Sequence, residues 1–220
     1  MVVSAADYNH IDQKVLEPQY ANYSEKYWDQ RVMAPSSLLY YVGLDIELPK
    51  MLHHVLFFDE NFDEHAKEIY EHPKWPTAPL LYASVTSKTD DTVAPKGCEN
   101  LFILIPVAPS LDDTDEVRER YFDMAISKLE AYNDLNIRDH IVMKRSYAHK
   151  DFISDYHSFR GNAYGLANTL RQTAILKPSL KNKKLKNLYF AGQLTVPGPG
   201  VPPSLISGEV VAREIVKDFG

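Results

Sequence analysis

Residues 187–212 have the sequence NLYFAGQLTVPGPGVPPSLISGEVVA, which predicts a strand, a loop and a helix in succession. An apolar run that ends in Ala191 and Gly192 is typical of a buried strand, and glycines let the backbone approach a ligand because they have no Cβ. Pro202 and Pro203 fix φ where the helix should begin. Free N–H groups and the positive end of the helix dipole would then face the loop. The stretch therefore predicts a site for an electron-rich flat group or an anion.

This stretch also resembles the carboxy-terminal signature of the bacterial-type phytoene desaturases, which are FAD-dependent carotenoid oxidoreductases with a glutathione-reductase-like flavin fold. Further stretches resemble other segments of that family, namely residues 2–8 (VVSAADY), 32–37 (VMAPSS), 82–97 and 161–173. The resemblance spans almost the whole chain. It implies that the strand and helix of residues 187–212 close the flavin domain, with the helix amino terminus directed at the pyrimidine edge of the isoalloxazine ring.

Members of that family begin with a Gly-rich βαβ unit whose G-x-G-x-x-G turn cradles the FAD pyrophosphate, and no such pattern follows a predicted strand here. Gly161 and Gly165 have the wrong spacing, and prolines interrupt Gly198 and Gly200. The sequence is therefore expected to be the second half of a larger enzyme. We expect it to need an amino-terminal FAD-binding half as its partner, and to be inactive and to bind FAD weakly or not at all when isolated.

Flavin contact is expected at six positions: Gly192, Gln193, Gly200, Val201, Pro202 and Ser204. The N1–C2=O edge of the isoalloxazine ring becomes anionic on reduction, so a helix terminus or backbone N–H directed there stabilises the reduced form. The Gln193 amide adds a neutral hydrogen-bonding group. Spacing alone is equally compatible with an ordinary strand–loop–helix connection, and the resemblance favours the flavin. The sequence does not identify the catalytic residues.

Composition excludes several classes of function. The 220 residues carry a formal net charge of −6, whereas a protein that binds a nucleic-acid backbone needs a basic face. Cys98 is the single cysteine, which excludes a disulfide framework or thiolate metal site, and the scattered histidines form no zinc pattern, so no metal is expected. Without a long apolar run, the expected location is cytoplasmic, with at most peripheral membrane contact. The lysine-rich run 177–186 is expected to be a solvated connection, with anionic-lipid contact as the alternative.

The order of elements favours an α+β fold, in which a substrate domain with a mixed or antiparallel sheet is joined to flavin-domain pieces at either end. The expected domains are residues 1–22, 23–160 and 161–220. Helices are expected at residues 9–16, 59–70, 113–132 and 151–156 and after Ser24, with Asp113 and Glu116 as a capping box. Strands are expected at 37–43, 53–58, 80–85, 100–107 and 140–149, the first two and the next two paired as antiparallel hairpins.

The resemblance implies a desaturase that transfers hydride from a long apolar polyene to flavin. Candidate apolar lining residues are Tyr40, Tyr41, Phe57, Phe58, Leu81, Phe102 and Leu104, but each is better explained as a core residue and none is assigned to a site. The alternatives are a carotenoid isomerase, a retinol saturase-like relative or another carotene desaturase, and a non-catalytic module that binds a lipid, a carotenoid or a protein partner. A homodimer is a further expected partner state, because a large apolar patch seldom stays solvated.

Overall fold

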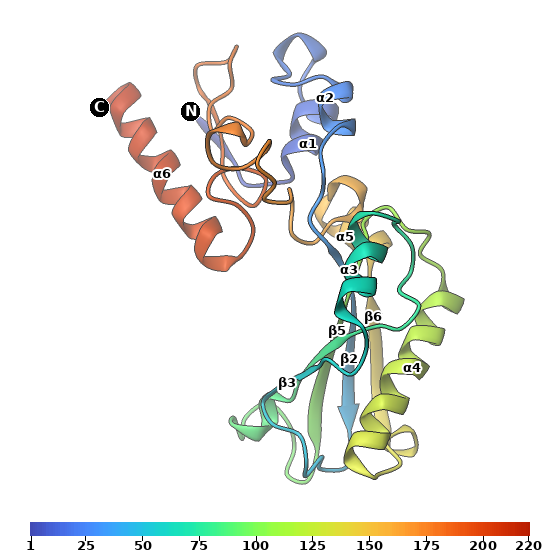
Figure 1. Cartoon of the computed structure of the whole chain (residues 1–220). Coiled ribbons are helices and arrows are strands. Elements are labelled where there is room, and N and C mark those ends of the chain that lie inside the picture. Colours follow the sequence, from blue (N-terminus) through green and yellow to red (C-terminus); the bar gives the residue numbers. More distant parts are fainter. The chain divides into compact units, whose positions relative to one another are not determined.

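The structure, a computed structural model, describes residues 1–220 and divides the chain into two units. The first unit combines residues 1–35 with residues 151–220, and the second unit is the continuous segment 36–150. Figure 1 labels the α-helices of both units and the strands β2, β3, β5 and β6. These units group segments 23–35 and 151–160 with the ends of the chain, whereas the predicted domains placed both segments with residues 36–150.

The second unit is built on a five-stranded antiparallel sheet with the strand order β3-β4-β5-β2-β6. The strands are β2 (Ser36–Leu44), β3 (His54–Phe57), β4 (Leu81–Ser84), β5 (Glu99–Val107) and β6 (Ile141–Tyr147). The predicted pairing of the segments around β4 and β5 is confirmed. The predicted hairpin of β2 with β3 is wrong, because β5 and β6 occupy both edges of β2 and β3 pairs with β4.

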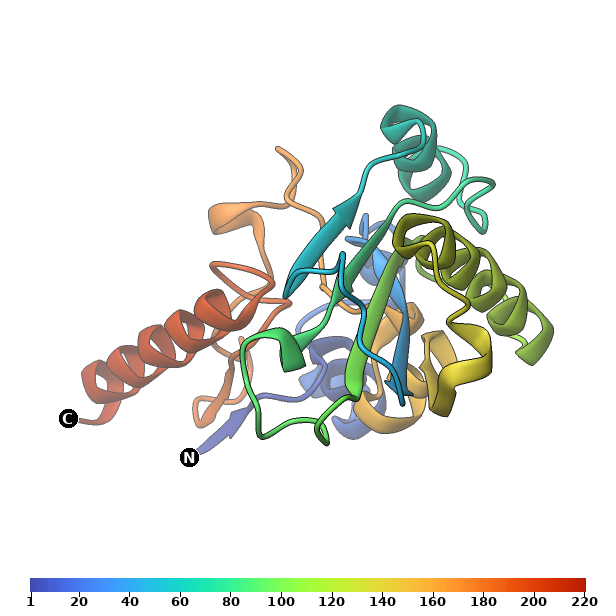
Figure 2. The ribbon, with the colours of Figure 1, turned by 90° about the horizontal axis from the view of Figure 1, so that it is seen from below.

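Helix α4 (Asp115–Asn133) covers one face of this sheet, as Figures 1 and 2 show. Every second residue of β5 from Leu101 to Val107 is buried, and these side chains pack with Phe122, Ala125 and Leu129 of the helix. The helix cap lies one residue later than predicted. The Thr114 side chain accepts the Val117 N–H, whereas Asp113 instead forms a two-pronged ion pair with Arg118, with both contacts at 2.6 Å.

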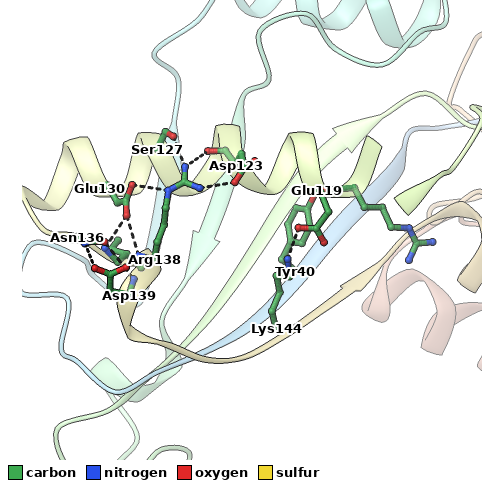
Figure 3. Close-up of polar contacts among 11 residues, drawn as sticks. Tyr40, Glu119, Asp123, Ser127, Glu130, Asn136, Arg138, Asp139 and Lys144 are labelled. Carbon is green, nitrogen blue, oxygen red and sulfur yellow. Dashed lines mark hydrogen bonds and ion pairs between the residues drawn. The ribbon is translucent and has the colours of Figure 1, made fainter. Parts of the chain in front are cut away.

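Arg138 fastens the segment after α4 back onto the helix, as Figure 3 shows. Its guanidinium donates to Asp123 at 2.5 Å, to the Ser127 hydroxyl at 2.7 Å and to Glu130 at 3.2 Å. The remaining elements of this unit are α3 (Phe62–Tyr70), the short 3-10 helices Thr86–Lys88 and Arg138–His140, and the start of α5 (His149–Tyr156). The second unit is therefore stabilised by one sheet, one long helix and a set of side-chain hydrogen bonds and ion pairs.

The stability of the second unit is expected to depend on pH because of His149. Its ring is buried, Nε2 lies 2.8 Å from the Ala108 carbonyl, and Trp75 packs edge-on against it. Burial lowers the pKa of His149, so the unfolded chain binds the proton more readily than the folded one. The free energy of unfolding should therefore fall as pH drops below the ordinary histidine pKa of about 6.5. Urea unfolding followed by Trp75 fluorescence should show a shallower pH slope in His149→Gln, and an unchanged slope would contradict this assignment.

The first unit joins the two ends of the chain. β1 (Val2–Ser4) pairs in parallel with β7 (Leu188–Phe190), and α6 (Val201–Phe219) follows β7, which confirms the predicted strand–loop–helix order. The remaining elements are α1 (Tyr8–His10), a π-helical turn (Ile11–Val15), α2 (Glu25–Asp29) capped by Ser24 as predicted, and the 3-10 helices Pro18–Tyr20, Phe159–Gly161 and Ala174–Leu176. Tyr8 stacks on Phe190 with ring centroids 3.9 Å apart, so the core forms between segments far apart in sequence.

Asp12 explains why residues 23–35 belong to the first unit. Its side chain is fully buried and accepts the N–H of Asn22 at 2.5 Å, the N–H of Tyr23 at 3.0 Å and the indole N–H of Trp28 at 3.3 Å. Trp28 in turn packs against Tyr8 in the core of this unit. A boundary after residue 22 would separate this carboxylate from Tyr23 and Trp28. The predicted α+β fold class is confirmed, and no helix combines the length and the apolar character needed to span a membrane.

Candidate cofactor site

The carboxyl ends of β1 and β7 open into one cavity of about 540 Å³. Because the two strands are parallel, the residues after each of them meet at the same edge, which is where open α/β sheets bind ligands. The lining comes from four places in the first unit. It consists of Ala5 to Tyr8 after β1, Phe152 and Tyr156 of α5, Ser158, Asn162 and Ala163, and residues 191–194 with Ser204 and Gly208 of α6.

The structure brings together three of the six predicted flavin contacts. Gly192, Gln193 and Ser204 line the cavity. Gly200 caps helix α6, and Val201 and Pro202 lie exposed in its first turn outside the cavity lining. Flavin contact at all six positions stays a prediction.

Hydrogen bonds hold the loop after β7 against helix α6 and against Asn162. The Gly192 N–H donates to the buried Ser207 hydroxyl of α6 at 2.6 Å, and the Thr195 hydroxyl donates to the Gly192 carbonyl at 2.8 Å. The Gln193 amide donates to Asn162 Oδ1 at 3.3 Å, and this oxygen also accepts the Gly165 N–H at 2.7 Å. These hydrogen bonds hold Gly192 and Gln193 in place in the cavity wall.

The amino terminus of α6 offers fewer N–H donors than its sequence position suggested. Pro202 and Pro203 have no N–H, and the Ser204 N–H donates to the Gly200 carbonyl at 2.9 Å. Val201 is therefore the first-turn residue that can direct an N–H out of the helix. The prediction of several free N–H groups is wrong here, because the prolines that start the helix remove the donors.

Asp7 is the acidic group of the cavity wall. One carboxylate oxygen accepts the His10 N–H at 3.0 Å and the other accepts the Phe159 N–H at 3.1 Å, which joins α1 to the segment before Asn162. Burial raises the pKa of Asp7, although these N–H donors act in the opposite direction. Asp7 therefore has a structural role at this edge.

Two relatives are similar to this chain in sequence. The carotenoid 3,4-desaturase of Haloarcula japonica is 41% identical over 218 residues, which cover 99% of this chain and 44% of that protein. The 4,4'-diapophytoene desaturase (4,4'-diaponeurosporene-forming) of Staphylococcus aureus strain MRSA252 is 33% identical over 195 residues, or 84% of this chain and 38% of that protein. The chain belongs to the carotenoid desaturase family.

This desaturase-family chain spans less than half the length of the relatives it matches. No protein-family model matches it. Among solved structures, an oxidoreductase from Methanosarcina mazei superposes with a TM-score of 0.55 at 12% identity, covering 97% of this chain and 42% of that one. At this level of identity the likeness concerns the fold alone, and it agrees with the two-unit α+β architecture described above.

Sequence reasoning missed Lys177. It lies in the run that was expected to be a solvated connection, and Lys184 and Lys186 of this run are indeed exposed. Lys177, however, is 5% exposed, and its Nζ has no hydrogen-bond partner. The sequence offers no signal that separates Lys177 from the lysines that follow it, since burial comes from the loop 197–200, which is more than 15 residues away in sequence.

Gly208 supports a prediction about the cavity-facing side of α6. A Cβ at this position would meet no atom within 4 Å, and the backbone is helical. In residues 1–220 alone, Gly208→Ala should therefore raise the free energy of unfolding by up to about 1 kcal/mol, because glycine is the poorer helix former. A loss of stability in urea unfolding would contradict an open face here.

Proposed function

We propose that the protein is an FAD-dependent oxidoreductase that desaturates a long apolar polyene. The observation that carries this proposal is the 41% identity to a carotenoid 3,4-desaturase along 99% of the chain. When bound, FAD would accept a hydride from a C–H bond of the substrate. The chain spans only part of its relatives, so the activity is proposed for the protein as a whole and not for residues 1–220 alone.

Two features support a flavin at the cavity of the first unit. Gly192 lines the cavity with a φ of 112°, so no Cβ occupies this part of the wall. The walls contributed by Ala5, Ala163 and Leu194 are apolar and suit a flat ring. We propose that Gly192, Gln193 and Ser204 hold the ring, and that the bonds from Ser207 and Asn162 orient them.

The open face of the second unit's sheet supports an apolar substrate. Tyr41, Phe102 and Leu104 alternate with core residues of β2 and β5, so they lie on the face opposite α4. A hollow of about 460 Å³ on this face is lined by Tyr41, Phe102 and Met143 among others. Of the other candidate lining residues, Tyr40, Phe57 and Leu81 belong to the core cluster. An apolar face can bind a hydrocarbon chain without burying any charge that lacks a partner.

The decisive experiment follows the mass and absorption of the product. The whole protein, supplied with FAD and an acyclic C30 or C40 polyene, should yield a product two hydrogens lighter per new double bond, with absorption at longer wavelength. A product of unchanged mass with altered geometry would instead identify an isomerase. Polyene binding without FAD binding or turnover would support the non-catalytic binding module and contradict the proposal.

A matched measurement tests the contribution of residues 1–220. The described chain contains no strand and Gly-rich turn that could cradle a pyrophosphate, so we propose that it binds FAD weakly by itself. Fluorescence titration of FAD into residues 1–220 and into the whole protein should show tight stoichiometric binding only by the latter. Tight binding by residues 1–220 would contradict this division of the site.

A further inference from the structure

Lys177 carries a buried amine that the fold of the first unit leaves without a partner. The residue is 5% exposed, and no donor, acceptor or carboxylate lies within bonding distance of its Nζ. Burial alone lowers its pKa, with no charged neighbour acting in the opposite direction. A buried ammonium in such surroundings is expensive unless it gains a counter-charge, so this position is suited to an anion that comes from outside these 220 residues.

The amine lies directly beneath the loop that precedes helix α6. A Cβ placed on Gly198 would come within 3.3 Å of Lys177 Nζ and 3.4 Å of its Cε, so the amine lies in tight contact with this backbone. Gly198 is itself buried and has a φ of 136°, which disfavours any other residue. The Lys177 amine therefore packs against the backbone of the loop that joins β7 to α6.

Lys177 also offsets a deficiency of the helix terminus. The first turn of α6 has two prolines, and the Ser204 N–H is used inside the turn. The helix dipole still places the equivalent of roughly half a positive charge at this terminus. Few N–H groups there remain free to donate to a ligand. A full positive charge next to the same loop adds attraction for an anion that the backbone alone would supply poorly.

Resting on the proposed flavin function, we propose that Lys177 is a positioning residue that places positive charge beneath loop 197–200 and stabilises the negative charge a flavin gains on reduction. The role is electrostatic, and no bond to the flavin is made or broken by the amine. Charge of this kind shifts the balance between oxidised and reduced flavin and strengthens any flavin adduct that carries negative charge.

The test uses the whole protein with FAD bound and two readouts that do not depend on turnover. Sulfite adds to oxidised flavin and leaves negative charge on the ring, so its affinity reports nearby positive charge. In Lys177→Met, sulfite should bind about tenfold more weakly and the flavin midpoint potential should fall by about 30 mV, which is a tenfold change for two electrons. Lys177→Arg should stay close to the wild type, and the exposed control Lys184→Met should be unchanged.

The outcomes separate the inference from the function on which it rests. If FAD binds and Lys177→Met leaves both sulfite affinity and potential unchanged, the electrostatic role is wrong while the flavin function stands. If the wild type does not bind FAD, both are overturned. Should Lys177→Met fail to fold, the pH dependence of the wild type and of Lys177→Arg decides: sulfite affinity that falls with rising pH in the wild type but not in Lys177→Arg supports the role, and the same dependence in both overturns it.

Discussion

Asp12→Ala is expected to lower the free energy of unfolding of the first unit by about 3–5 kcal/mol. The carboxylate is fully buried and accepts N–H groups from Asn22, Tyr23 and Trp28. Alanine would leave these donors without an acceptor in a site from which water is excluded, and each such donor costs roughly 1–3 kcal/mol. Urea unfolding followed by Trp28 fluorescence in a Trp75→Phe background would measure the loss.

Two further variants define this effect. Asp12→Asn keeps one acceptor oxygen and should cost less than alanine, while Glu17→Ala should change stability by less than about 0.5 kcal/mol, because Glu17 is exposed and bonds only to Gln19. Equal losses for Asp12→Ala and Glu17→Ala would show that the buried carboxylate does not organise residues 22–28.

Gly165→Ala is expected to destabilise the first unit by about 2–4 kcal/mol and to weaken FAD binding by the whole protein. Gly165 has a φ of 76°, and a Cβ there would lie 2.9 Å from the Gln193 carbonyl oxygen, which belongs to the backbone and cannot rotate away. The substitution therefore combines backbone strain with displacement of the loop that lines the cavity. Urea unfolding and FAD titration would measure the two consequences.

Gly97→Ala is the matched control for this prediction. Gly97 has a similar φ of 81°, but a Cβ there would meet nothing within 4 Å. It should therefore show the strain alone, about 1–2 kcal/mol, with FAD binding unchanged. If Gly165→Ala cost no more than Gly97→Ala, the close approach to Gln193 would have no energetic weight.

Local signals in the sequence predicted local structure well. Ser24 caps α2, the periodic apolar residues form α4, and residues 187–212 form β7, a loop and α6 as their composition indicated. These elements depend on neighbouring residues, so capping, periodicity and proline position suffice to identify them. The lack of N–H donors at the start of α6 also follows from Pro202 and Pro203 and was open to sequence reasoning.

Features that depend on distant partners were not predictable. β2 pairs with strands 55 or more residues further along the chain, and strand composition alone does not indicate which edge receives which neighbour. Lys177 is buried by a loop that its own neighbours in sequence do not reveal. The cavity likewise requires β1 and β7, so only three of the six predicted contacts line it.

The pairing of Val2–Ser4 with Leu188–Phe190 has a consequence for biosynthesis. A ribosome delivers residues 36–150 complete before the partner of β1 has been made, so the antiparallel sheet and its helix can form during translation while β1 is still unpaired. Contacts across such a long stretch of chain form slowly. Tyr8 and Trp28 therefore stay uncovered, and open to aggregation, until Leu188–Phe190 has been made.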